Sequence, residues 1–236
     1  MEGGKPGSPL ASLWGDYSLA TVLTPSPCKS FRDILKYRNV DVGGRRVNTM
    51  RTPRGVARKG PNGFEVIFER HIPHPPQRVW SALTEPEKIE TWFCARVEIE
   101  RRLGGKIIEH HDHVGVDVHG EVTRWEAPRV FEHSWWFGNA KKTPENKVLW
   151  ELFPEESGTR LVLTHRRLGL DEGGMSGAHV SLDVLCAVLD GADPMRHAAP
   201  VGNFRDGEFV QTRAGRGFWA NRERLEQEYK RDFAAV

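Results

Sequence analysis

Residues 147–168 read KVLWELFPEESGTRLVLTHRRL, two runs of alternating apolar and polar side chains on either side of Glu156-Ser157-Gly158. A period of two predicts a pair of antiparallel strands joined by a tight turn. The same alternation extends back to residue 95 through ARVEIERR, GKIIEHH, VDVHGEVTRW and RVFEHSWW. Six short strands with tight connections favour an antiparallel meander, because parallel neighbours would need crossover helices.

Further predicted elements lie before and after this strand-rich region. Residues 64–73, FEVIFERHIP, predict one more strand, which ends at Pro73. The residues that follow change to helical spacing, and their prolines suit the starts of two short helices. Residues 175–191, MSGAHVSLDVLCAVLDG, predict a long helix. Its apolar face comprises Ala178, Leu182, Leu185 and Leu189.

This order of elements is typical of an α+β fold. We expect a curved antiparallel sheet of about seven strands wrapped round the long helix, with two short helices after the first strand. The long helix is placed to cover the concave face of such a sheet. The arrangement would enclose a cavity between the sheet and the helix.

The chain resembles the START-like helix-grip (SRPBCC) superfamily in four segments: RHIPHPPQRVWSALTEPEKIETWF, GEVTRWEAPRVFEHSWW, LWELFPEESGTRLVLTHRRL and SGAHVSLDVLCAVLDG. It is most similar to the polyketide-cyclase-like branch named for the activator of heat shock protein 90 ATPase. The similarity covers roughly residues 64–191 and implies the helix-grip fold. The family usually carries Gly-Trp where this chain has Gly177-Ala178. The missing indole would leave room in the cavity unless Trp135 or Trp150 refills it.

Charge and pattern together divide the chain into three parts. Residues 1–63 hold eleven Lys and Arg against four Asp and Glu, whereas the rest holds 23 against 28. We expect residues 1–62 to be a basic, disordered extension, with a start at Met50 as an alternative. Residues 63–193 would form the START-like domain, and 194–236 a loop and an amphipathic helix packed on it. That helix has one apolar stripe, formed by Phe218, Leu225, Tyr229 and Phe233.

Composition limits which classes of partner and which cellular compartment we expect for this chain. With 38% hydrophobic and 28% charged residues, the chain has the balance of a globular protein. The basic arm lacks the interleaved aromatic residues of a nucleic-acid module, and no run approaches the ~18 apolar residues of a spanning helix, so neither nucleic acid nor membrane is expected as a partner. The three cysteines, Cys28, Cys94 and Cys186, have no pairing or metal-ligand spacing, which favours a reducing cytoplasm.

Strand parity indicates which side chains face the cavity. The inward positions carry apolar and aromatic residues with a few polar ones, a composition typical of a small-molecule site. An alternative is that these side chains simply fill the core. The predicted ligand-binding residues are Phe131, His133, Trp135, Val148, Trp150, Leu152, Leu161, Leu163, His165, Ala178, His179 and Leu182.

Histidines are the remaining candidates for chemistry. His133, His165 and His179 could meet in the cavity, but their spacing is not a metal motif and buried histidines are more often structural. His110, His111 and His113, with Asp112, are interpreted as a solvated hairpin tip. Nucleophile and phosphate-loop motifs are absent from the sequence. We therefore assign no catalytic residue, metal ligand or cofactor.

The leading hypothesis is a cytoplasmic protein that binds a small apolar or aromatic molecule between sheet and long helix. The resemblance implies two alternatives. One is a cyclase-, aromatase- or hydrolase-like enzyme that uses cavity histidines. The other is a chaperone-type interaction module with an unidentified protein partner. A shared fold does not decide among them.

Overall fold

The computed structural model describes residues 52–93, 95–111, 115–138, 143, 145–191, 202–205, 208–211 and 213–236, with the side chains of 202–220 left out. Residues 1–51 of the predicted extension lie outside this description, as do Cys28, Cys94, Asp112 and His113.

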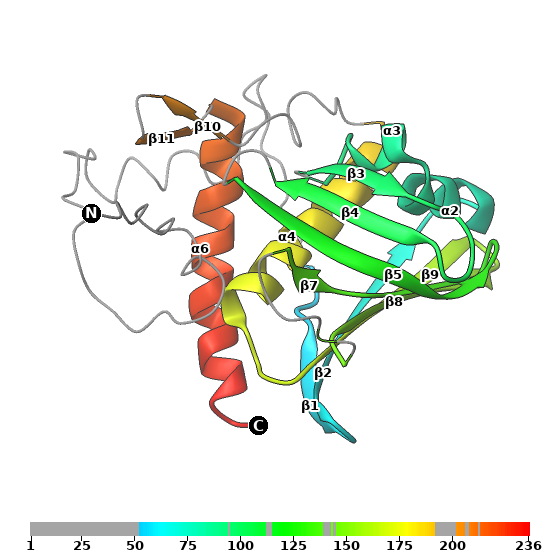
Figure 1. Cartoon of the computed structure of the whole chain (residues 1–236), viewed down its shortest axis with the longest axis horizontal. Coiled ribbons are helices and arrows are strands. Elements are labelled where there is room, and N and C mark those ends of the chain that lie inside the picture. The colour runs from blue at the N-terminus through cyan, green and yellow to red at the C-terminus, as the bar shows by residue number, and fades with distance from the viewer. Residues whose placement is uncertain are drawn as a thin grey trace, which may run out of the picture. The chain divides into compact units, whose positions relative to one another are not determined.

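Nine strands form one antiparallel sheet in the order β1-β2-β9-β8-β6-β5-β4-β3, with β7 pairing to β5. The strands are β1 (Val56–Gly60), β2 (Gly63–Ile72), β3 (Arg96–Ile99), β4 (Lys106–His111), β5 (Val116–Glu126), β6 (Val130–Ser134), β7 (Trp136–Phe137), β8 (Lys147–Glu155) and β9 (Gly158–Arg167). The sheet is curved and unclosed (Figure 1). The predicted meander is confirmed, and the predicted first strand pairs with the last strand of the meander, β9.

Two strands were not expected. β1 precedes Phe64, where order was predicted to begin, and pairs with β2 through the turn at Gly60–Gly63. Its sequence, VARKG, has too few apolar residues to show alternation. The predicted strand 129–136 is divided after Ser134 into β6 and β7. The backbone N–H of Trp135, between them, donates to the carbonyl oxygen of Asn146, just before β8 begins. β7 then continues along β5.

Four helices accompany the large sheet: α2 (Pro76–Thr84), α3 (Pro86–Ile89), α4 (Glu172–Leu189) and α6 (Arg213–Phe233). The two short helices begin at their prolines, as predicted. α4 begins earlier than predicted, because the carboxylate of Asp171 caps it by accepting the backbone N–H of Gly174 at 2.9 Å. A two-stranded hairpin, β10 (Gly202–Arg205) with β11 (Glu208–Gln211), lies where only a loop was expected.

The long helix α4 lies against the concave face of the sheet (Figure 1), and the two share one core. Leu163 from β9 and Leu182 and Leu185 from α4 are almost completely buried in it. α6 docks on this domain through Leu225 and Tyr229, with Phe233 half-buried, whereas the side chain of Phe218 lies outside the description. The α+β helix-grip architecture predicted from the sequence is therefore confirmed.

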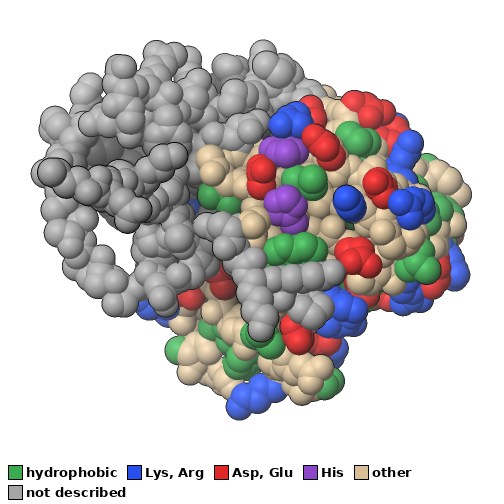
Figure 2. Space-filling view, viewed as in Figure 1, with side chains coloured by type: hydrophobic (Ala, Val, Ile, Leu, Met, Phe, Trp, Pro, Cys, Tyr) green, Lys and Arg blue, Asp and Glu red, His purple; other side chains and the backbone are tan. Residues whose placement is uncertain are grey.

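The outer surface of the domain carries charges of both signs. Lys and Arg side chains are interspersed with Asp and Glu over the coloured part of the face shown in Figure 2. Among the helices that the structure describes, none is both long and apolar enough to cross a membrane.

Candidate functional site

A cavity of about 140 Å³ lies between the concave face of the sheet and α4. The sheet register explains which side chains reach it. Phe131, Trp150 and Leu163 are direct neighbours across β6, β8 and β9, and His133, Val148 and His165 form the next such row. Since alternate residues of a strand share one face, both rows point to the same concave side. The two rows form one wall of the cavity.

Nine of the twelve predicted ligand-binding residues line this cavity. They are Phe131, His133, Trp135, Val148, Trp150, Leu163, His165, Ala178 and Leu182. The cavity reaches Ala178, the position at which the family usually carries an indole. The structure thus brings these side chains together around one space, while their binding of a ligand stays a prediction.

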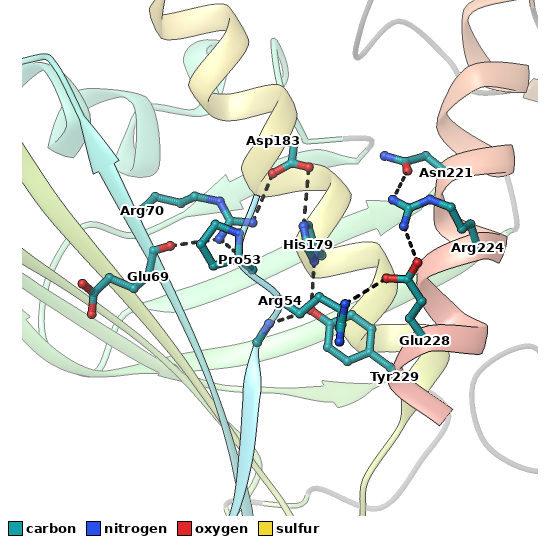
Figure 3. A network of polar contacts seen from close by, with 11 residues as sticks. Pro53, Arg54, Glu69, Arg70, His179, Asp183, Asn221, Arg224, Glu228 and Tyr229 are labelled. Carbon is teal, nitrogen blue, oxygen red and sulfur yellow. Dashed lines mark hydrogen bonds and ion pairs between the residues drawn. The ribbon is translucent and has the colours of Figure 1, made fainter. Parts of the chain in front are cut away.

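Three predicted residues lie elsewhere. Leu152 and Leu161 are partners across β8 and β9, one row beyond Trp150, and are buried in the closed core. His179 points toward α6 (Figure 3). Its side chain is 2% exposed. Adjacent residues of a helix point about 100° apart, so Ala178 and His179 do not face the same space. These three positions are corrections to the predicted cavity wall.

His179 belongs instead to a buried polar network that joins α4, β2 and α6 (Figure 3). Its Nδ1 lies 2.9 Å from the hydroxyl of Tyr229, and its Nε2 lies 3.5 Å from a carboxylate oxygen of Asp183. The other oxygen of Asp183 accepts a hydrogen bond from Arg70 at 3.1 Å. Burial and the nearby positive charge of Arg70 lower the pKa of His179 to about 3, so the ring is neutral.

Several cavity residues were not predicted. Trp92 and Phe93 close one side after α3, and Glu109 and His111 come from β4. Arg167 is the last inward residue of β9, and Arg222 reaches in from α6. Strand parity could have found Arg167 and Glu109, because each continues an inward alternation: Leu163, His165, Arg167 and Ile107, Glu109, His111.

The interpretation of His111 as part of a solvated hairpin tip is wrong. Its side chain lines the cavity, is 13% exposed, and lies 3.3 Å from the carboxylate of Glu109. His110 points to the opposite face, where its ring contacts Asp117 and Glu98. Over the described ranges, no group of three or more His, Cys, Asp and Glu side chains is arranged to hold a metal ion.

Two imidazoles in the cavity wall are electrically neutral. His133 is 4% exposed, and burial lowers its pKa below the ordinary value. The pKa of His165 is lowered further, first by burial and then by the positive charge of Arg167 and by His133. Both rings therefore remain uncharged at pH 7, and each offers one N–H donor and one nitrogen acceptor.

Arg167 supplies a positive charge at the edge of the cavity. Its guanidinium lies over the Trp135 ring, 4.4 Å from the centroid, and its Nη1 lies 3.4 Å from a carboxylate oxygen of Asp171. Burial lowers its pKa, which the carboxylates of Asp171 and Glu109 oppose. The stacking and the ion pair hold this charge against the wall of the site.

Comparison with known proteins identifies relatives of this domain. The family model described as "Activator of Hsp90 ATPase homolog 1-like protein" matches residues 73–189. The solution structure of CalU16 from Micromonospora echinospora is 19% identical, with a TM-score of 0.54, and the match covers 80% of this chain and 99% of that one. The crystal structure of CalU16 is 23% identical, with a TM-score of 0.51, covering 75% and 96%. At these identities CalU16 shows the fold alone.

A third solved structure is more similar in sequence. The protein encoded by gene BPP1335 from Bordetella parapertussis is 28% identical, with a TM-score of 0.50. That match covers 77% of this chain and 94% of the other. No curated protein matches the chain.

Proposed function

Because the chain belongs to the family of Activator of Hsp90 ATPase homolog 1-like proteins, within the START-like helix-grip superfamily, we propose that it binds a small apolar or aromatic molecule between the sheet and α4. The observation that carries this proposal is the cavity of about 140 Å³ with mainly apolar and aromatic walls. An apolar protein cavity of about 150 Å³ binds benzene. This cavity therefore has room for one six-membered ring with few substituents.

Burial of the ligand would supply most of the affinity. An aromatic side chain buries roughly 150–250 Å², and at about 25 cal/mol per Å² a ring of similar size gains about 4–6 kcal/mol. Such a gain corresponds to a Kd of about 1 mM to 0.04 mM before the costs of association are subtracted. Tighter binding would need the polar groups of the wall, above all His133 and His165.

The enzyme and interaction-module alternatives stay predictions. In the part of the chain that the structure describes, neither His133 nor His165 is hydrogen-bonded to a carboxylate that could orient it for acid–base chemistry. The proposed cytoplasmic location is supported by the wide separation of the three cysteines in the sequence. It is also supported by the free thiol of Cys186, whose pKa burial raises to about 11, as is usual for an inert thiol.

Mass spectrometry of the full-length protein tests the proposal directly. The protein would be purified under native conditions, and the small molecules released on unfolding would be identified. We expect release of a molecule with one aromatic or apolar ring, in a stoichiometry approaching one per chain. Release of nothing, together with no binding of added toluene, would contradict the proposal.

A further inference from the structure

The hydrogen bond of His133 determines which of its ring nitrogens carries the proton. Nδ1 lies 3.0 Å from the backbone carbonyl oxygen of Ser134. A carbonyl oxygen can only accept, so Nδ1 must be the N–H donor. The ring is neutral because it is buried, and a neutral imidazole has a single N–H. Nε2 of His133 is therefore an acceptor with a free lone pair.

This acceptor belongs to the cavity wall. His133 lines the cavity, and Phe131 stacks on its ring with the centroids 5.1 Å apart and the planes 24° apart. The stacking and the bond to Ser134 hold the ring in one orientation. No described residue donates a hydrogen bond to Nε2. Among the described residues, Nε2 of His133 is not one of the fully buried side-chain atoms that lack a hydrogen-bond partner. It is therefore open to the cavity, where it can accept a hydrogen bond from a bound molecule.

A second imidazole flanks the same part of the wall. His165 pairs with Val148 in the sheet register, and Val148 pairs with His133, so the two rings lie two strands apart at the same level. The ring of His165 contacts Phe68 edge-on, with the centroids 6.1 Å apart. Neither ring nitrogen of His165 has a hydrogen-bond partner among the residues that the structure describes. As a neutral ring, it offers one donor and one acceptor.

We propose that the ligand of this cavity is a phenol, whose hydroxyl donates to Nε2 of His133 and accepts from the N–H of His165. The inference rests on the proposed function and names its ligand class. A hydroxyl is the smallest group that both donates and accepts. The neighbouring row of Phe131, Trp150 and Leu163 provides the apolar surface for the aromatic ring.

An aromatic acid fits this wall less well than a phenol. A carboxylate has no proton to donate, and its charge would face the lone pair of His133 Nε2. Two cations line the cavity, and both already have partners. Arg167 pairs with Asp171 and stacks on Trp135, and Arg222 donates to the backbone carbonyl oxygen of Gly173 at 3.3 Å. Glu109 adds a negative charge to the lining. The wall therefore favours a neutral donor.

The test compares p-cresol with 4-fluorotoluene, a near-isostere that lacks the donor, by calorimetric titration of the full-length protein at pH 7. The measured quantity is the Kd of 4-fluorotoluene divided by the Kd of p-cresol. It is determined for the unmodified protein and for His133→Phe. We expect this ratio to fall by about fivefold or more in His133→Phe, the factor given by one ordinary hydrogen bond. His110→Phe, the same change on the outer face of β4, should leave the ratio unchanged.

A second measurement does not depend on a variant. The ¹⁵N resonance of His133 Nε2 should shift when p-cresol is added and stay in place with 4-fluorotoluene. An unchanged ratio in His133→Phe, no ¹⁵N shift with p-cresol, or tighter binding of 4-methylbenzoate than of p-cresol would overturn the phenol assignment. If 4-fluorotoluene still binds in that case, the proposed function stands. If none of these compounds nor toluene binds, both proposals fail.

Discussion

The hydroxyl of Tyr229 on α6 lies 2.9 Å from Nδ1 of His179 on α4, and it also accepts the backbone N–H of Gly55 at 2.7 Å. One phenolic oxygen therefore joins the C-terminal helix, the long helix and the segment before β1 (Figure 3). Tyr229 is completely buried and His179 almost so. With a neutral His179, the hydroxyl donates to Nδ1, and the N–H at Nε2 faces Asp183.

Tyr229→Phe tests the contribution of this oxygen. The change keeps the ring but leaves the N–H of Gly55 and Nδ1 of His179 without their partner. Unpaired buried groups of this kind cost about 1–3 kcal/mol each. We expect a loss of about that size in the free energy of unfolding, measured with urea. A variant as stable as the parent would show that the hydrogen bonds do not hold α6.

The pKa of His179 makes the stability of the fold depend on pH. The folded pKa of His179, about 3, lies below the ordinary value of 6.5. As the pH falls from 6.5 toward 3, the unfolded chain binds a proton that the folded chain does not. The fold is therefore most stable above about pH 6.5 and loses stability below it. Between pH 7 and pH 5 this single group should remove about 2 kcal/mol from the free energy of unfolding.

His179→Gln separates this contribution from those of the other buried histidines. His133 and His165 also have lowered pKa values and act in the same direction. Urea denaturation at pH 7, 6 and 5 should therefore show a steeper loss for the parent than for the variant. Parallel curves would mean that His179 is not held neutral in the fold.

Trp150→Ala should enlarge the cavity. Trp150 lines it, packs against the core and contacts Trp92 edge-on at 6.3 Å. Replacing a buried tryptophan with alanine costs about 3–5 kcal/mol, and because Trp150 is half-buried we expect about 3 kcal/mol. The variant should also bind naphthalene, a two-ring molecule too large for the parent cavity.

Trp136→Ala is the matched control for this change. Trp136 lies on β7 outside the cavity lining, where its ring stacks on His119. Its loss should cost less stability and should not create naphthalene binding. Equal naphthalene binding by the parent and Trp150→Ala would contradict the size assigned to the cavity.

Regular alternation explains how far the sequence could predict this site. On β6, β8 and β9, apolar residues at every second position identify the concave face. The residues of that face that line the cavity are Phe131, His133, Val148, Trp150, Leu163 and His165. The same rule, continued by one step, reaches Arg167. The predicted inward face of β9 stopped at His165. A buried guanidinium extends it by one step, because Trp135 and Asp171 stabilise the charge of Arg167.

Features that depend on contacts between distant segments could not be predicted. His179 lies on the apolar side of α4, and only the position of Tyr229 on α6 shows which space it faces. β1 has little apolar pattern, and backbone contacts define it instead. It pairs with β2, and the backbone N–H of Gly55, just before it, donates to the hydroxyl of Tyr229. The volume of the cavity likewise depends on how α4 sits on the curved sheet rather than on any local pattern.

Toluene binding to the parent and to Ala178→Trp, measured by calorimetric titration together with urea denaturation, tests the ligand cavity most directly. Ala178 lines the cavity at the position where the family usually has an indole. We predict that the parent binds toluene, and that Ala178→Trp fills the space, abolishes this binding and is at least as stable as the parent. A parent that binds no toluene, with Ala178→Trp losing the roughly 1–3 kcal/mol typical of an overpacked core, would contradict the account.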